Sequence, residues 1–377
     1  MKILSVSNCP LEESQGSGYV IGGYARRLRA RGHEVVLLGP EDYEWGRALG
    51  AGKRARVFSG YSWTALRRLR RESFDVVELW GAEAWWVMRR LAARRVRPLL
   101  VARSNGLEPH MHEALVRHAA GAPGAALPAR KRLGLALFER WQRPEEAFRG
   151  ADLLTTVSGS DRRFALARGY QPADRVLALE NPLPDDWLGQ TPPGARAPVI
   201  GFFGSWIPRK GAGLLPDVLP AVLRAHPEWR ARLVGPGEEA ARAFAGRPGA
   251  ERIEVVPFER DRTRLRELYR GLAVVIVPSQ FESFGLVAAE AMACGCVLVA
   301  SPTGFAADLR PDDEAVIVPS PAPAAWIAAL DAVLRDTPRR ERLARAGAAR
   351  VQGLRWEAAT SRLLETYQRL LDARSAR

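Results

Sequence analysis

The stretch QFESFGLVAAEAMACGCVLVA, residues 280–300, holds a glycine turn, one short helix and the beginning of an apolar strand. The apolar run LAVVIVP precedes it, and two such runs joined by a helix are typical of a parallel βαβ unit. The helix is predicted to begin near Gly285 and Leu286. Glu282 then lies in the loop at the carboxyl end of a strand, and Glu290 lies on the second helical turn.

The surroundings of the two glutamates carry the interpretation, since acids eight residues apart also occur elsewhere in this chain. Free amides at a helix start and the positive end of its dipole form an anion site, and Gly285 lets a ligand approach the backbone. Glu282, before the helix start, and Glu290, behind it, can accept hydrogen bonds from hydroxyls on either side of a bound diphosphate. The competing interpretation makes Glu282 a loop acid and Glu290 a surface helix residue.

Apolar runs alternate with amphipathic helical stretches along the whole chain, which predicts α/β units with parallel sheets covered on both faces. Segment 181–198 contains five prolines and predicts an exposed linker, with the boundary near residue 195. The predicted strands are KILSVS (2–7), HEVVLLG (33–39), FDVVELW (74–80), PLLVARS (98–104) and ADLLTTVS (151–158) in a first unit, and PVIGFFGS (198–205), WRARLVG (229–235), RIEVVPF (252–258), LAVVIVPS (272–279) and CVLVAS (296–301) in a second.

The last 22 residues, 356–377, are predicted to form a helix because their apolar residues recur at helical spacing. The face consists of Leu363, Leu364, Tyr367, Leu370 and Leu371.

The composition is that of a soluble globular protein, with 47% hydrophobic and 26% charged residues in a chain of 377. That length suggests two domains. No apolar run is long enough to span a bilayer, and the first residues lack the features of a signal peptide, so we expect the protein in the cytoplasm. The three cysteines, Cys9, Cys294 and Cys296, form neither a disulfide framework nor a zinc site and are interpreted as small apolar residues.

The net charge of +14 is concentrated at residues 51–100, which carry twelve Lys/Arg against four acids. Such a patch attracts phosphate in nucleic acid, anionic lipid or a phosphorylated substrate, and the alternative is a set of solvated helix faces. No recognised nucleic-acid-binding motif accompanies it, so no nucleic acid partner is expected. A peripheral contact with the anionic inner face of the membrane stays open. The arginines concerned are Arg67, Arg68, Arg70 and Arg71, which bracket Leu66 and Leu69.

Two further glycine-rich segments follow predicted strands. GFFGSWIPRKGAGLL, residues 201–215, presents Arg209 and Lys210 beside a glycine turn, and two adjacent cations suit a diphosphate. QGSGYVIGGYARRLRARGHEVVLL, residues 15–38, has a glycine loop that opens a helix and an RGHEV turn that ends it.

These three elements, in this order, resemble the GT-B glycosyltransferases, specifically the retaining enzymes of glycosyltransferase family 4. The resemblance implies two Rossmann-like doubly wound domains that face each other across a cleft. Residues 1–190 would bind the acceptor and residues 196–357 the nucleotide sugar, with the helix 358–377 crossing back to pack on the first domain. It further implies transfer of a sugar from a nucleoside-diphosphate sugar to a hydroxyl of a carbohydrate, lipid-linked or small-molecule acceptor, with retention of anomeric configuration.

The resemblance also implies roles for residues that match the motifs. Ser205 departs from the pattern, since many members carry arginine there, and Arg209 is expected to take over that role. The implied catalytic residues are Arg209, Lys210 and Glu282; the donor-binding residues are Gly204, Ser283, Phe284, Gly285, Leu286 and Glu290; the acceptor-side residues are Gly16, Ser17, Gly18 and Asn105.

Asn105 is a second departure, because many members have a histidine at this position. His110 or His112 from the following segment are candidates to replace it, and the alternative is that both are surface or structural histidines.

No metal or cofactor is expected, because the sequence contains no Asp-x-Asp for a metal–diphosphate complex. The cations and helix amides would then stabilise the leaving group. Trp80, Trp85 and Trp86 follow a strand and either flank the cleft or pack in the core.

The main competing function is that of an NAD(P)-dependent oxidoreductase. Gly16, Gly18 and Gly22 form a partial dinucleotide-binding pattern, and Glu41 and Asp42 lie about twenty residues on. Against it, the glycines come well after the first strand, and the motifs of the second unit are left unexplained. A sugar phosphorylase or epimerase of the GT-B fold is the other alternative.

Overall fold

The computed structural model describes residues 1–12, 16–44, 53–121, 142–189 and 196–375. They divide into two α/β units, Met1–Asn181 with Trp356–Arg377 and Pro182–Arg355. The division comes earlier than the predicted boundary near residue 195, because the Leu183 amide donates to the Leu354 carbonyl at 2.9 Å and Trp187 is buried. The prediction of an exposed linker holds for Asp185, Asp186 and Gly189 but not for Pro182, Leu183, Trp187 and Leu188, which are buried, while 190–195 lie outside the described residues.

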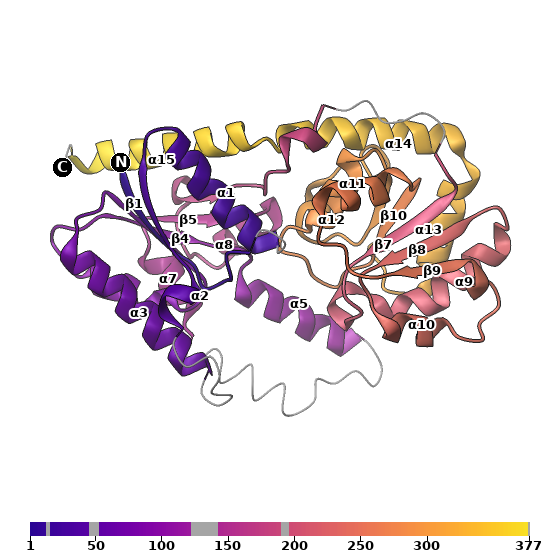
Figure 1. Cartoon of the computed structure of the whole chain (residues 1–377), viewed down its shortest axis with the longest axis horizontal. Helices are drawn as coiled ribbons and strands as arrows, with labels where there is room; N and C mark the ends of the chain where they lie inside the picture. The colour runs from indigo at the N-terminus through magenta and orange to yellow at the C-terminus, as the bar shows by residue number, and fades with distance from the viewer. Residues whose placement is uncertain (13–15, 45–52, 122–141, 190–195, 376–377) are drawn as a thin grey trace. The chain divides into compact units, whose positions relative to one another are not determined.

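In the described part of the first unit, six parallel strands form a sheet in the order β2-β1-β3-β4-β5-β6 (Figure 1). Ile3 of β1 pairs with Val35 of β2 on one side and with Val76 of β3 on the other. The strand order therefore reverses between β1 and β3, and open α/β sheets bind ligands outside the carboxyl ends of strands at such a point. The strands are β1 (Lys2–Val6), β2 (Glu34–Leu38), β3 (Val76–Trp80), β4 (Leu99–Arg103), β5 (Leu153–Thr156) and β6 (Val176–Ala178).

Helices cover both faces of this sheet because successive strand residues point to opposite sides. Ile3 joins the apolar layer of α1 and α15, whereas Leu4 joins that of α3 and α4. The helices of this unit are α1 (Gly16–Ala30), α2 (Pro40–Tyr43), α3 (Lys53–Arg71), α4 (Ala84–Ala92), α5 (Glu108–Gly121), α7 (Pro144–Gly150), α8 (Gly159–Ala167) and α15 (Trp356–Ser375).

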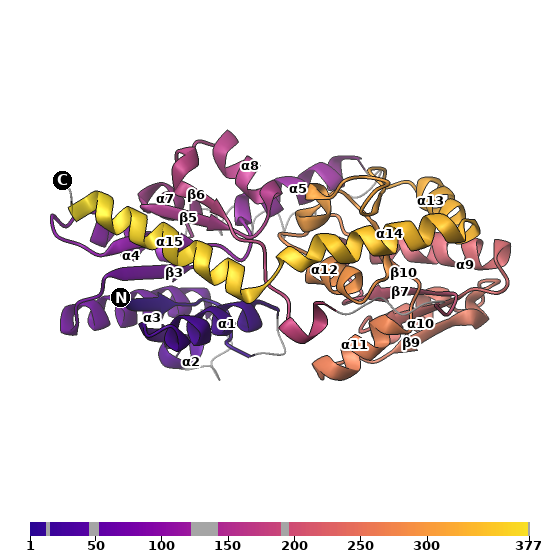
Figure 2. The ribbon, with the colours of Figure 1, turned by 90° about the horizontal axis from the view of Figure 1, so that it is seen from above.

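The C-terminal helix α15 packs on the first unit through the face that its spacing predicts. Leu363, Tyr367 and Leu370 are buried, and Figure 2 shows this helix lying across the sheet of its unit. Gly23 of α1 makes room for the Trp356 ring, since an added Cβ would lie 2.1 Å from Trp356 Cη2. The apolar layer and this close approach fix the helix on the sheet.

A buried ion pair lies beneath α15. Arg103 and Glu78 are each 2% exposed, with Arg103 Nε 4.0 Å from Glu78 Oε1, and Tyr367 donates to the same oxygen at 2.5 Å. The guanidinium lies over the Tyr24 and Trp80 rings, 4.5 and 4.4 Å from their centroids. Burial alone would lower the pKa of Arg103, but Glu78 and the tyrosines raise it, so the guanidinium stays charged.

The described part of the second unit holds another sheet of six parallel strands, in the order β12-β11-β10-β7-β8-β9. Val274 of β10 pairs with Ile200 of β7 on one side and with Val297 of β11 on the other, so the order reverses between β7 and β10. The strands are β7 (Val199–Phe203), β8 (Arg230–Val234), β9 (Ile253–Val256), β10 (Val274–Val277), β11 (Val297–Ala300) and β12 (Val316–Ile317).

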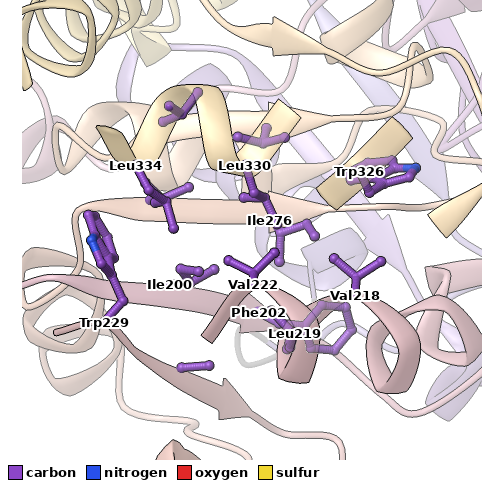
Figure 3. Packing of buried hydrophobic residues seen from close by; sticks show 14 of the residues in the cluster. Ile200, Phe202, Val218, Leu219, Val222, Trp229, Ile276, Trp326, Leu330 and Leu334 are labelled. Atoms are coloured by element: carbon purple, nitrogen blue, oxygen red, sulfur yellow. The ribbon is translucent and has the colours of Figure 1, made fainter. Parts of the chain in front are cut away.

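The core of the second unit joins one face of its sheet to two helices (Figure 3). Phe202 and Ile276 point from the strands toward Val222 of α9, and Trp326 and Leu330 of α13 close the same layer. This layer fixes β7 and β10 side by side, which positions the loops that follow them. The helices are α9 (Leu215–Ala225), α10 (Glu238–Phe244), α11 (Arg262–Arg270), α12 (Leu286–Ala293), α13 (Pro323–Arg335) and α14 (Thr337–Arg350).

Candidate active site

The turn after β7 is fixed against the end of β10. Gly211 has φ +72°, and a Cβ there would lie 2.0 Å from the Pro278 carbonyl oxygen, so only glycine fits. The Gln280 amide donates to the Arg209 carbonyl at 2.8 Å. The loops that follow β7 and β10 are therefore held together, and Arg209 and Lys210 lie in a short 3₁₀ turn of the first of these loops.

Arg209, Lys210 and Glu282 form one cluster at this point. Lys210 Nζ lies 2.7 Å from Glu282 Oε1, Ser279 Oγ donates to the same oxygen at 2.7 Å, and Arg209 Nη1 lies 3.7 Å from Oε2. Arg209 also donates to the Phe281 carbonyl at 3.1 Å. Two cations therefore face one carboxylate that is 8% exposed, and the local excess of positive charge suits a diphosphate.

Helix α12 begins at Leu286, as predicted, after Gly285 with φ +88°. No described side chain caps its first turn, so the backbone amides there are suited to an anionic ligand. The Phe284 side chain is buried against Phe305, with ring centroids 5.3 Å apart, so it packs in the core. Gly204, with φ +139°, begins the facing turn close to the Lys210 stem.

Glu290 is not a surface residue, because it is only 5% exposed. Arg262 donates to its Oε1 at 3.0 Å and Tyr269 donates to its Oε2 at 3.1 Å. The Tyr269 ring stacks on Phe203, the last residue of β7, with centroids 3.9 Å apart and planes at 23°. Sequence reasoning missed Arg262 and Tyr269; their spacing of seven residues, two turns along one helix face, was the available signal.

In the first unit, Ser17 and Asn105 come together at Cys9, which sequence reasoning also missed. Asn105 Nδ2 donates to Cys9 Sγ at 3.8 Å, and Ser17 bonds the same thiol. Burial raises the Cys9 pKa against the effect of both hydrogen bonds, so the thiol stays protonated. Gly16 begins α1 and Gly18 lies inside it, where a Cβ would lie 2.2 Å from the Glu12 carbonyl oxygen. The predicted glycine loop is thus a first helical turn packed against the preceding chain.

Two carboxylates, those of the buried Glu83 and the half-buried Glu108, lie near the carboxyl ends of β1, β3 and β4. Glu83 accepts from Asn8 at 3.0 Å and from Gln142 at 2.5 Å, and burial raises its pKa. Burial, with the charge of Glu83 adding to it, raises the pKa of Glu108 to about 7. His110 lies beside these acids, bonded to Asp161 at 2.7 Å. Glu83 and Glu108 could not be predicted from the sequence, because neither belongs to a recognisable motif.

Trp80 does not line a ligand surface. It is the last residue of β3, is 2% exposed, and donates from Nε1 to Ser5 Oγ at 3.0 Å. Trp85 stacks on Phe58, with centroids 5.6 Å apart and planes at 21°, and meets Trp86 edge-on. Of the two alternatives left open for Trp80, the structure therefore shows core packing.

Two family models match the two units. The model described as Glycosyltransferase Family 4 matches residues 14–186, and the one described as Glycosyl transferases group 1 matches residues 197–336. Together they match most of the chain.

Curated relatives and solved structures agree with these matches. A D-inositol 3-phosphate glycosyltransferase from Xylanimonas cellulosilytica is 36% identical over 52% of this chain and 49% of its own length. A phosphatidyl-myo-inositol mannosyltransferase from Mycobacterium leprae is 32% identical over 63% and 64%. The chain thus spans about half the length of the first relative and under two thirds of the second. A sucrose-phosphate synthase from Thermosynechococcus elongatus shares the fold, with a TM-score of 0.74 at 19% identity over 99% of this chain and 100% of that one.

Proposed function

We propose, from the premise that this chain belongs to the GT-B glycosyltransferases, that it transfers a sugar from a nucleoside-diphosphate sugar to a hydroxyl acceptor with retention of configuration. One observation carries this proposal. Arg209 and Lys210 face Glu282 at the strand-order reversal of the second sheet, and α12 begins four residues after Glu282 with its first turn uncapped by any side chain that the structure describes. The group offers positive charge for a diphosphate and a carboxylate for sugar hydroxyls.

Arg209 and Lys210 act where negative charge develops on the leaving diphosphate. Breaking the bond between the anomeric carbon and the diphosphate leaves negative charge on oxygen, and Lys210 and Arg209 stabilise it together with the α12 amides. The acceptor hydroxyl attacks from the leaving-group side and gives its proton to the departing diphosphate, so no protein nucleophile is required. When the donor binds, Lys210 exchanges part of its contact with Glu282 for phosphate oxygens, which frees Glu282 to accept from the sugar.

The competing oxidoreductase has no support from the geometry. Asp42, one of the acids expected to bind a ribose, instead accepts from the Gly39 amide at 2.8 Å at the start of α2. We propose metal-independent transfer, supported by the two cations at the site and the lack of Asp-x-Asp in the sequence.

A ligand screen with a turnover assay tests this function. One of the uridine, adenosine and guanosine diphosphates should stabilise the protein, by about 2.7 kcal/mol at a hundred times its Kd. Its sugar conjugate should be turned over at the same rate with excess EDTA, to a product with the donor's anomeric configuration. Stabilisation by none of the three diphosphates would contradict the function. Activity lost in EDTA and restored only by magnesium or manganese would contradict metal independence.

We further propose that α3 contacts anionic lipid from the first unit. Trp63 is 63% exposed, and Arg67 and Arg70 are exposed four and seven residues on, along the same face of the helix. Leu66 and Leu69 pack against the core instead. Tryptophan among arginines suits a membrane surface, and no described helix is long and apolar enough to cross a bilayer.

Vesicle binding should depend on these arginines. Each arginine near an anionic surface contributes about 1 kcal/mol, so Arg67→Gln with Arg70→Gln should weaken binding to phosphatidylserine vesicles roughly 30-fold at low salt. The matched control is Arg342→Gln with Arg345→Gln on α14, which removes the same charge and should leave binding unchanged. Sedimentation with neutral and anionic vesicles across a salt series gives the measurement. Equal recovery of the unmodified protein with both vesicles would show that the arginines only cover the surface.

A further inference from the structure

Both oxygens of the buried Glu290 carboxylate are held by one helix. Arg262 and Tyr269 stand near opposite ends of α11 and point the same way, and each donates to a different oxygen. Burying a carboxylate costs free energy unless its oxygens accept hydrogen bonds. A purely structural role of Glu290 would therefore already account for one such donor. The second donor also fixes the rotation of the carboxylate plane.

The two donors leave acceptor capacity in a defined direction. A carboxylate has about four lone-pair positions, so each Glu290 oxygen retains one after Arg262 and Tyr269 are satisfied. Burial and the charge of Glu290 raise the pKa of Tyr269 well above its ordinary value, so the phenol remains a donor. Two remaining acceptor positions on neighbouring oxygens suit two neighbouring hydroxyls of one ring.

Two aromatic residues fix the donors themselves. Trp187 meets the Tyr269 ring edge-on, with centroids 6.0 Å apart, and lies under the Arg262 guanidinium at 5.2 Å. Phe203, which immediately precedes Gly204, stacks on a face of the Tyr269 ring. Tyr269 is 1% exposed, so it has little freedom to turn away. The Glu290 carboxylate is thus coupled through one ring to the turn that carries Arg209 and Lys210.

We infer that Arg262 and Tyr269 are positioning residues that orient Glu290 toward the vicinal diol of the donor nucleoside. This inference rests on the proposed function and deepens it. The competing explanation is that the pair only satisfies a buried acid, in which case its loss lowers stability without changing how the site distinguishes a diol from a single hydroxyl.

The test compares Kd values of the stabilising nucleoside diphosphate and of its 2′-deoxy counterpart. A hydrogen bond to a charged group contributes about 1.5–3 kcal/mol, so the unmodified protein should prefer the ribose form by roughly 10- to 100-fold. Tyr269→Phe should reduce that preference several-fold and raise the donor KM, with kcat nearly unchanged. The matched control is Tyr170→Phe, which removes another buried phenol that donates to a carboxylate, that of Glu145 at 2.9 Å. It should keep the full preference.

Two further variants separate the possible failures. Glu290→Ala should abolish the ribose preference, and a preserved preference there would contradict the donor-site role of Glu290 itself. If Glu290→Ala loses the preference while Tyr269→Phe keeps it, the positioning inference fails and the proposed function stands. Should Tyr269→Phe fold poorly, the ratio of Kd values for the 2′-deoxy and ribose forms is measured in Arg262→Gln instead. An unchanged ratio in that variant also overturns the inference.

Discussion

Lys210→Ala should lower turnover by about two to three orders of magnitude, the usual effect of removing one donor that stabilises developing charge. The structure gives the reason for so large an effect. Lys210 is ion-paired with Glu282 at 2.7 Å, whereas Arg209 is 3.7 Å from the same carboxylate and also bonded to the Phe281 carbonyl. Arg209 is therefore not free to replace Lys210. Steady-state turnover at saturating donor gives the measurement.

Two controls define what this loss means. Lys2→Ala removes another ion-paired lysine, bonded to Glu34 and Glu72 at the amino end of β1, and turnover should stay normal. Lys210→Arg keeps the charge but not its compact shape, so it should recover only part of the rate. A near-normal rate in Lys210→Ala would remove this lysine from the site.

Arg103→Met should destabilise the first unit by about 3–5 kcal/mol, because it leaves Glu78 as an unpaired charge in the interior. Both residues are 2% exposed, so no water is at hand to solvate the remaining carboxylate. Methionine also loses the contacts of the guanidinium with Tyr24 and Trp80. Denaturant unfolding followed by tryptophan fluorescence measures the change.

The double variant Arg103→Met with Glu78→Gln identifies the cause. It leaves no buried charge, and the glutamine oxygen can still accept from Tyr367, so much of the lost stability should return. If the single and double variants lose equal stability, the effect comes from packing around Arg103 and not from the ion pair.

The sheets could be predicted because buried parallel strands are continuous apolar runs. Each predicted strand is present, with ends within two residues. Val176–Ala178 and Val316–Ile317 were missed because these edge strands have only three and two residues, too few to show a pattern. Both the cleft and the core stayed open for Trp80, because the end of a strand does not decide which way its last side chain points.

The candidate site was predictable where it follows strand ends and not where it depends on packing between helices. Arg209, Lys210 and Glu282 stand in loops whose position follows from the strands before them. Tyr269 belongs to an ordinary amphipathic helix, and its partner Glu290 lies on another. Only the packing of α11 on α12 brings Tyr269 and Glu290 together, and this packing cannot be predicted from a single sequence.

The first unit consists of two segments of the chain that the second unit separates, and this determines the order in which the two units can fold during synthesis. Residues 1–181 emerge before the second unit, but α15, which covers one face of their sheet with Trp356 and Tyr367, emerges only after it. The second unit is one continuous segment of the chain and can fold before the first unit has its last helix. The apolar layer around Ile3 and Val20 therefore stays without this cover until α15 has been made, and exposed apolar surface of this kind favours aggregation during folding.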